Sequence, residues 1–332
     1  MNTNNIKNLN VPVFLLNVPF SLATEQPNNI WMNELKPEDR QIDHSRAVHQ
    51  WLKLYQFLAS QGIVYVLPSQ PGLQDQTYVS NLGIVLPHTE NNVVVISNFR
   101  SEPRRGETAV GQQFFASMGF ECVIAPPYFE GEADLKHLRD NIYFGAYDIR
   151  TSMNTLNWFR DVYDMNVIPI KMTDEYLYHL DCVIFPLTSE KVLVCTKLCD
   201  DETLRSIEQV AEIIDVDYKL ARVGITNNVR FGDYVLCDFA LDEFEDEYYD
   251  EKHYNEELFA NFAVRTRSWI ETTRAHPQRG HEFASNEKRK LDKLTVLCAE
   301  NGLELVTFNL SEFYKSGALL SCLVMKLNYP HT

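Results

Sequence analysis

Four separated stretches of this sequence carry side chains whose types suit thiol chemistry. Cys322 lies in the segment 315–328, after a small-residue turn and at the start of a strand-like apolar run. Upstream, Glu130 lies in FEGEAD, Arg150 lies in GAYDIRTS, and a His-x-Asp pair lies in YHLDCVIFPL. An acid, an arginine, a histidine with a nearby carboxylate and a thiol form the set that attack on a guanidinium carbon needs.

That reaction makes specific demands, because the guanidinium carbon is delocalised, cationic and a poor electrophile. Breaking one of its C–N bonds needs a strong nucleophile, and a thiolate is the best that proteins offer near neutral pH. Carboxylates bind the planar guanidinium through paired hydrogen bonds. A histidine can protonate the departing nitrogen and then activate water. A second carboxylate keeps that histidine oriented and basic.

The His-x-Asp pair consists of His179 and Asp181, at the start of an apolar run. We expect this run to be a strand, and residues i and i+2 of a strand share a face, so both side chains should point the same way. Taken alone, such a pair is more often structural. Glu130 beside a glycine is typical of a turn, and Arg150 alone is typical of a surface charge. Their combination favours a functional interpretation.

The order of these motifs resembles the guanidino-group modifying superfamily, which has the pentein fold. This superfamily includes arginine deiminases, dimethylarginine dimethylaminohydrolases, amidinotransferases and arginine dihydrolases. Seven segments match in the same order: NIWM, YVSN, RRGE, FEGEAD, GAYDIRT, HLD and SGALLSC. The resemblance covers roughly residues 12–239 and 290–328. Each motif is unspecific by itself, whereas their shared order is specific.

The resemblance implies four residues that take part in the chemistry. Cys322 is expected to be the nucleophile that forms an amidino-thioether intermediate. His179 is expected to act as general acid and then as general base, and Glu130 is expected to orient it. Asp181 is expected to hold the guanidinium nitrogens. The resemblance implies no metal and no organic cofactor.

Four further residues are expected to bind substrate. Arg104 and Arg150 are expected to hold its α-carboxylate. Asn81 stands where deiminases carry a second guanidinium-binding aspartate, and Asn29 matches an asparagine of the arginine dihydrolase branch. Two asparagines therefore favour a dihydrolase over ordinary arginine deimination. Asp181 argues mildly against dimethylarginine hydrolysis.

One departure from the family pattern concerns the turn before the nucleophile. Ala318 replaces the second glycine that precedes the cysteine in the family, and alanine tolerates positive φ poorly. The turn that carries Cys322 is therefore expected to differ in detail.

Alternating strand and helix patterns must position these residues. Helices are expected over 45–62, 202–214 and 286–302, and the first is expected to carry Val48, Trp51, Leu52, Tyr55 and Leu58 on one face. Strands are expected over 12–17, 63–67, 92–97, 122–126, 166–170, 182–187, 191–195, 234–239, 303–308 and 320–327. The strand–strand–helix rhythm recurs about every 50–60 residues, and no Ser/Gly linker divides the chain. With the resemblance, this predicts one α/β domain over 1–332: a pentein-type propeller of five ββαβ-like units with pseudo-fivefold symmetry and a central cleft.

Composition narrows the class of ligand. The net charge of −16 argues against a nucleic-acid partner and suits a small cationic ligand such as arginine.

The chain contains no apolar run of about 18 residues, so no membrane span is expected. The apolar segment 11–23 is expected to be a buried strand with a loop rather than a signal peptide. The seven cysteines show no paired framework, which indicates reduced thiols and a cytoplasmic protein.

One segment has no counterpart in the family pattern. Residues 240–285 are expected to form an insertion with an accessory helix, and 242–257 hold nine acids and one lysine. A solvated acidic loop is the simplest interpretation. A lid over the site, or a surface for a basic protein partner, is the alternative.

The favoured function is hydrolysis of a guanidinium C–N bond through a covalent Cys322 adduct, with an arginine dihydrolase-like outcome. The alternatives within the family are an amidinotransferase, with an amine as second nucleophile, and a dimethylarginine dimethylaminohydrolase. The alternative outside enzymes is a pentein scaffold that only binds. A depressed thiol pKa is expected to make Cys322 react selectively with a haloacetamidine.

Overall fold

The structure is a computed structural model that describes residues 6–240 and 277–330. The acidic segment 242–257 lies outside these residues, as does most of the insertion expected over 240–285. The end of that insertion, from Pro277, is the first part of helix α10 (Pro277–Glu300). The expectation of a single domain over 1–332 stays a prediction.

Within the described residues, fifteen strands form five sheets of three strands each. Four sheets follow one another along the chain: β3 (Gly83–Val85), β4 (Val93–Ile96) and β5 (Glu121–Ile124); β6 (Leu135–Arg139), β7 (Ile142–Tyr147) and β8 (Asn166–Lys171); β9 (Ile184–Pro186), β10 (Lys191–Val194) and β11 (Glu212–Asp215); β12 (Val229–Phe231), β13 (Tyr234–Asp238) and β14 (Glu304–Phe308). The fifth sheet joins the two ends of the chain: β15 (Met325–Lys326), β1 (Val13–Asn17) and β2 (Ile63–Leu67).

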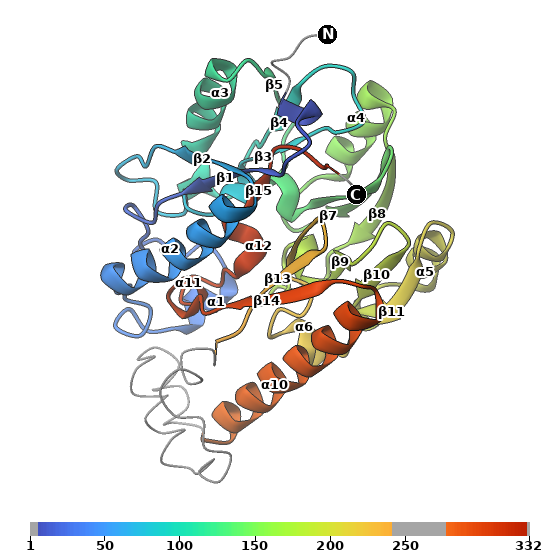
Figure 1. The fold of residues 1–332 in the computed structure, drawn as a ribbon. Helices are drawn as coiled ribbons and strands as arrows, with labels where there is room; N and C mark the ends of the chain where they lie inside the picture. The colour runs from blue at the N-terminus through green and yellow to red at the C-terminus, as the bar shows by residue number, and fades with distance from the viewer. Residues whose placement is uncertain (1–5, 241–276, 331–332) are drawn as a thin grey trace.

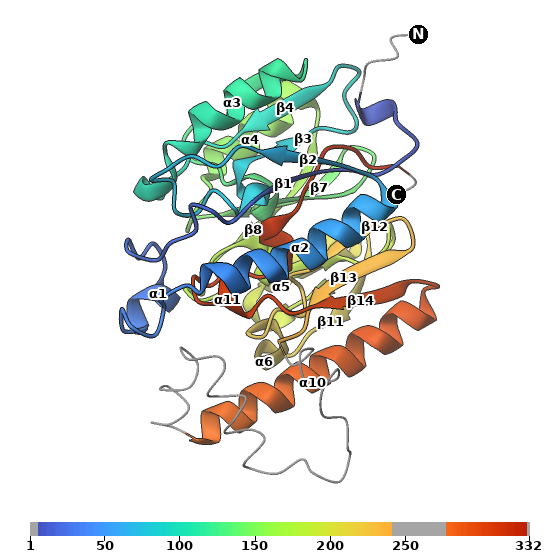
Figure 2. The same cartoon turned by 60° about the vertical axis from the view of Figure 1, so that its left-hand side comes forward.

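All five sheets share one pattern of pairing. The middle strand pairs antiparallel with the first strand and parallel with the third. A parallel pair needs a crossover connection, and each crossover here contains a helix. The five crossover helices are α2 (His44–Gln61), α3 (Glu107–Ser117), α4 (Met153–Tyr163), α5 (Asp201–Glu208) and α10. Figures 1 and 2 show these helices on the outside and the sheets inside.

The ring closes where β15 pairs with β1, with Phe14 opposite Lys326. The five repeated units and this closure confirm the predicted α/β-propeller with pseudo-fivefold symmetry. Shorter helical segments complete the fold: η1 (Ile6–Asn8), α1 (Ile30–Glu34), η2 (Val79–Leu82), η3 (Glu102–Arg104), η4 (Gly131–Ala133), η5 (Leu180–Cys182), η6 (Thr196–Leu198), α6 (Tyr218–Ala221), α11 (Ser311–Tyr314) and α12 (Leu320–Leu323).

Helix α2 shows how local sequence sets these elements. The Asp43 side chain caps its first turn by accepting from the Arg46 N–H, and the Gly62 N–H closes its last turn on the Leu58 carbonyl. The helix buries Trp51 and Leu58, as the apolar spacing predicts. Leu52, expected on the same face, is 40% exposed. Leu54 is buried instead, so the buried face of the helix lies closer to Leu54 than the apolar spacing predicts.

The end of the predicted helix 202–214 is wrong. Helix α5 ends at Glu208, and the last part of the predicted helix belongs to β11, which begins at Glu212. Ile213 and Ile214 pair in parallel with Val192 and Leu193 of β10. Both isoleucines are β-branched and pack well in a sheet. This preference outweighs the helix-like spacing that made them look like a continuation of α5.

The two strands expected to carry His179 and Cys322 are also corrected. His179 has extended backbone, with φ −113° and ψ 157°, but it precedes the helical turn η5, and strand β9 begins only at Ile184. Cys322 lies in the short helix α12, and strand β15 begins at Met325. The argument that His179 and Asp181 share a strand face is therefore wrong.

A short helical turn leads into the first strand of four sheets: η2 before β3, η4 before β6, η5 before β9 and α12 before β15. Turn η2 packs against both η4 and α12, so these segments meet although they are far apart in sequence. The predicted chemistry lies on these turns. Among the described helices, none combines the length and apolar character that crossing a membrane requires.

Candidate active site

A polar cavity lies where these turns meet. Six of the eight predicted site residues line it: Asn29, Asn81, Arg104, Arg150, His179 and Cys322. The other lining residues are Asn28, Asp75, Tyr78, Tyr178, Ser316 and Ala318. The remaining two predicted residues are not part of the lining. Glu130 contacts His179 and Arg150 of the lining, and Asp181 contacts Ser321, the neighbour of Cys322.

Glu130 lies at the start of turn η4 and is fully buried. Its Oε2 atom is 2.8 Å from Nε2 of His179 and 3.3 Å from Nη1 of Arg150. Burial disfavours the charge, yet Arg150 and the hydrogen bond from His179 outweigh it and hold the pKa of Glu130 below its usual value. An ionised carboxylate only accepts hydrogen bonds, so Nε2 of His179 is the donor and Nδ1 is left to exchange a proton.

Replacing Glu130 by glutamine is expected to destabilise the fold by about 3 kcal/mol at pH 7, because Arg150 would keep a buried charge without its partner. The folded-state pKa of Glu130 lies below that of the unfolded chain, which is about 4.3. Its contribution is therefore present above pH of about 4.3 and is lost as pH falls below that value. Urea unfolding measured from pH 7 down to pH 3 should show a shallower loss of stability for Glu130→Gln than for the unchanged protein.

The matched control is Glu190→Gln, since Glu190 is exposed. It should leave both the stability at neutral pH and its acid dependence almost unchanged. Equal acid dependence in Glu130→Gln and the unchanged protein would contradict a buried charge at Glu130.

Arg150 is held by three kinds of contact. Its guanidinium lies against Glu130, donates to the Asn28 carbonyl at 2.7 Å, and stacks 4.6 Å above the centre of the Tyr178 ring. Arg150 thus closes one wall of the cavity and neutralises Glu130. Its predicted contact with a substrate carboxylate stays a prediction.

Arg104 lines the cavity but is paired within the protein. Nε and Nη2 form a fork with the two oxygens of Glu107, at 2.9 and 2.8 Å, and Nη2 also contacts the carbonyl oxygens of Asp75 and Tyr78. The residue is 4% exposed. Any substrate group that reaches this guanidinium must share it with Glu107.

Cys322 is 8% exposed and lines the cavity. Burial, followed by the charge of Asp181, raises the pKa of the Cys322 thiol to about 12. The expectation of a depressed thiol pKa is therefore wrong for the ligand-free protein. Burial raises the pKa of the other six thiols as well: Cys122, Cys182, Cys195, Cys199, Cys237 and Cys298. Position in the cavity, not acidity, distinguishes Cys322.

Asp181 lies in turn η5 and is 1% exposed. Its carboxylate accepts a hydrogen bond from the Ser321 hydroxyl and a weak one from the Cys182 thiol, with 3.6 Å between sulfur and oxygen. Asp181 therefore lies beside α12, close enough for its charge to act on Cys322. A carboxylate next to a neutral thiol makes this end of the cavity favourable for a cation.

Asn29 and Ser316 connect two loops at the cavity wall. The Asn29 side chain caps α1 by accepting from the Met32 N–H at 2.8 Å, and its amide donates to the Ser316 carbonyl at 2.9 Å. The next residue, Gly317, takes the positive φ of 79° in the turn before the cysteine. Ala318 is not among the residues with positive φ, so the strain expected at Ala318 does not arise.

Two known enzymes are similar in sequence to part of this chain. The bifunctional arginine dihydrolase/ornithine cyclodeaminase AgrE of Nostoc sp. is 29% identical over 198 residues, which is 59% of this chain and 27% of AgrE. The dimethylarginine dimethylaminohydrolase of Mycobacterium tuberculosis is 26% identical over 180 residues, 54% of this chain and 57% of that protein. The chain thus matches about a quarter of AgrE. No family model matches the chain.

The solved structure of the N-terminal domain of ArgZ, an arginine dihydrolase from Cyanobacteria bound to product, superposes with a TM-score of 0.73. The superposition covers 96% of this chain and 98% of that domain, at 22% identity. The chain has the pentein fold. The resemblance inferred from the seven motifs is confirmed at the level of fold and of sequence relatives.

Six residues that line this cavity were not predicted as site residues, and three of them carry an ionisable side chain: Asp75, Tyr78 and Tyr178. Tyr78 and Tyr178 stand inside or beside matched motifs, so position next to Asn81 and His179 was an available signal. Asp75 belongs to no motif. Its Oδ2 accepts from the Asn28 amide at 2.6 Å, and burial raises its pKa although the charge of Arg104 opposes this. Among the described residues of this pentein, no three His, Cys, Asp or Glu side chains are placed to hold a metal ion.

Proposed function

We propose that this protein is a cysteine-dependent hydrolase of guanidinium C–N bonds, with arginine as substrate and ornithine, ammonia and carbon dioxide as products. The observation that carries the proposal is that Cys322 and His179 line one cavity, with Glu130 bonded to the imidazole and Asp181 beside the thiol. A structure of an ArgZ N-terminal domain variant is described as covalently bonded to a reaction intermediate, which supports a covalent route.

The first step is activation of Cys322. Burial and the charge of Asp181 raise the pKa of its thiol, and the positive charge of a bound guanidinium would favour the thiolate. Asp181 attracts that cation to the thiol. The thiol then gives its proton to His179, the sulfur attacks the guanidinium carbon to form a C–S bond, and one C–N bond breaks as His179 passes that proton to the departing nitrogen.

The second step regenerates the thiol. His179, now lacking the donated proton, takes one from water, and the resulting hydroxide attacks the amidino carbon. The C–S bond breaks and the sulfur leaves. A second round of this hydrolysis releases a second ammonia molecule and leaves the carbamate of ornithine, which loses carbon dioxide without further water. Arginine and two waters thus give ornithine, two ammonia molecules and carbon dioxide.

The dihydrolase outcome is favoured over deimination by Asn81 and Asn29, which line the cavity as neutral amides. Their polar groups can bind an intermediate without adding negative charge. The dimethylaminohydrolase is the second candidate, because one relative of this chain carries that name.

Product analysis tests the proposal. The protein is incubated with arginine alone, with arginine plus glycine as acceptor amine, and with asymmetric dimethylarginine, and products are identified by mass spectrometry. Ornithine and ammonia from arginine alone are the expected result. Citrulline as the final product indicates a deiminase, and ornithine that requires glycine indicates an amidinotransferase.

Two other results would contradict the proposal that this protein hydrolyses arginine. Turnover of dimethylarginine without turnover of arginine would assign the protein to the dimethylaminohydrolase class. No turnover of any of the three, with folded protein, would favour the scaffold that only binds.

A further inference from the structure

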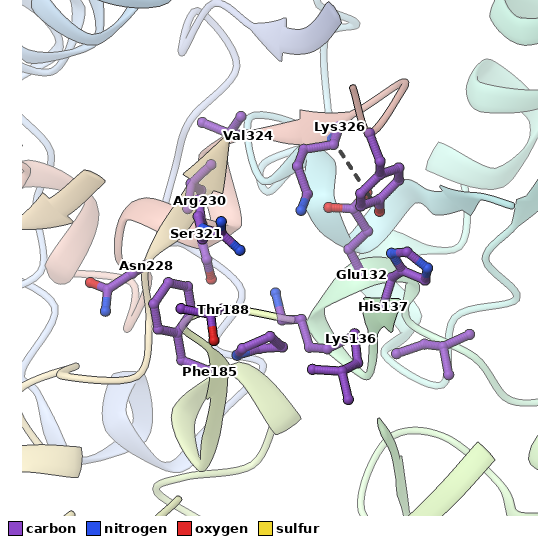
Figure 3. Close-up of a pocket in the computed structure, with 15 residues that line it drawn as sticks. Glu132, Lys136, His137, Phe185, Thr188, Asn228, Arg230, Ser321, Val324 and Lys326 are labelled. Carbon is purple, nitrogen blue, oxygen red and sulfur yellow. Dashed lines mark hydrogen bonds between the residues drawn. The ribbon is translucent and has the colours of Figure 1, made fainter. Parts of the chain in front are cut away.

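A second cavity borders the segment that carries Cys322. Ser321 lines this second cavity, whereas Cys322 lines the candidate active site. Its volume is about 50 Å³, which exceeds the room that one water molecule needs. Its walls come from the sheets that contain β6, β9, β12 and β15 (Figure 3). The two cavities share no lining residue.

Three cationic side chains meet in this second cavity. Lys136 comes from β6, Arg230 from β12 and Lys326 from β15. Figure 3 shows both amino groups and the guanidinium directed into the same space. Nε of Arg230 is buried and has no hydrogen-bond partner within the described part of the chain. A buried donor of this kind is costly unless something accepts from it.

One carboxylate, Glu132, lines the same cavity. Its Oε1 accepts from the Lys326 backbone N–H at 3.3 Å, drawn as the dashed line in Figure 3, and from the Tyr329 hydroxyl at 3.1 Å. Across the described residues, Glu132 forms no ion pair with Lys136, Arg230 or Lys326. Three cations against one anion leave an excess of positive charge.

The excess positive charge is unfavourable, and its effect is seen in the pKa of Lys326. Burial, together with the charges of Lys136 and Arg230, lowers the pKa of Lys326 to about 8, although Glu132 opposes the shift. The nearby His137 adds no charge at neutral pH, since burial lowers its pKa to about 4. The cavity therefore holds its cations at a cost that a bound anion would relieve.

We propose that this second cavity is a binding site for a small oxyanion of the sulfate or phosphate type. Arg230 presents a planar fork that matches such an anion, and Lys136 and Lys326 add point charges. The hydroxyl groups of Ser321 and Thr188 lie in the same lining. An anion that accepts from Ser321 would compete with Asp181, which now receives the Ser321 hydrogen bond.

Sulfate is the suitable probe, because it stays a dianion between pH 6 and pH 9. Isothermal titration of the full chain with sodium sulfate, at constant ionic strength set by sodium chloride, should give saturable binding of one anion. Arg230→Met should weaken the affinity at least tenfold. The matched control is Lys53→Met, which removes an exposed cation of helix α2 and should leave sulfate binding unchanged.

The pH dependence gives an independent readout. The groups that face the Lys326 amino group are Glu132, Lys136, Arg230 and Tyr329. Because Lys326 loses its proton near pH 8, sulfate affinity should fall as pH rises from 7 to 9, and Lys326→Met should remove most of this fall. Sulfate should also raise the pKa of Lys326, measured by NMR of the labelled lysine amino group.

Several outcomes would overturn the site. They are the absence of saturable sulfate binding, equal binding by Arg230→Met in a protein with unchanged thermal unfolding, and a Lys326 pKa that sulfate does not move. Arg230→Lys, which keeps the charge but not the fork, guards against a folding defect and should bind with intermediate affinity. None of these measurements depends on enzymatic activity.

Discussion

Replacing Cys322 by alanine is expected to lower kcat for arginine by about 10⁴-fold or more, because no other described thiol lines the cavity. Substrate should still bind, since the charges that attract it, above all Asp181, remain. The measurement is ammonia release at saturating arginine, together with arginine binding by calorimetry. The control is Cys122→Ala, which removes a thiol of strand β5 that lies outside the cavity.

Alkylation separates the role of the thiol from general damage. Burial and the charge of Asp181 raise the pKa of the Cys322 thiol, so the thiol form predominates at pH 7. A neutral haloacetamide should therefore react slowly. A cationic chloroacetamidine resembles the guanidinium, and the Cys322 sulfur displaces its chloride to form a thioether. This reagent should react at least tenfold faster. Cys322→Ala should abolish this fast reaction, and substantial arginine turnover by Cys322→Ala would refute the covalent route.

Replacing His179 by glutamine is expected to lower kcat about 10³-fold, because the departing nitrogen then has no acid and the second water has no base. Glutamine can still donate a hydrogen bond to Glu130, so thermal unfolding should change little. KM should change less than kcat. The rate that remains should also lose the pH dependence that the imidazole gives to the unchanged enzyme.

The matched control for this variant is His49→Gln, an exposed position of helix α2. It should leave kcat and its pH profile unchanged. If His179→Gln lowers kcat with an unaltered pH profile, the imidazole only positions other groups and does not transfer protons.

The predicted elements that proved correct have strong local signals. Strands β1, β2, β4 and β10 are runs of β-branched and apolar residues, and helix α2 has both a cap and an apolar face. Three of the missed strands lack such signals. Strands β3 and β12 have three residues each, and β6 reads LKHLR. Their extended form depends on pairing with a neighbouring strand.

The candidate site shows the same division between local and long-range information. The order of motifs was enough to select Cys322, His179 and Glu130, because their types and their resemblance to a family pattern do not depend on coordinates. The local argument for His179 was wrong, since a strand was expected where turn η5 forms. Turns of three residues leave little periodic signal.

The sequence by itself determined which side chains are present to do chemistry and the order in which five ββαβ-like units carry them. The tertiary structure decided their proximity and their charge states. The thiol pKa of Cys322 depends on burial and on Asp181, and the second cavity collects cations from three different sheets. The reason is physical: desolvation and Coulomb interactions act through space between groups that only the closed ring brings together.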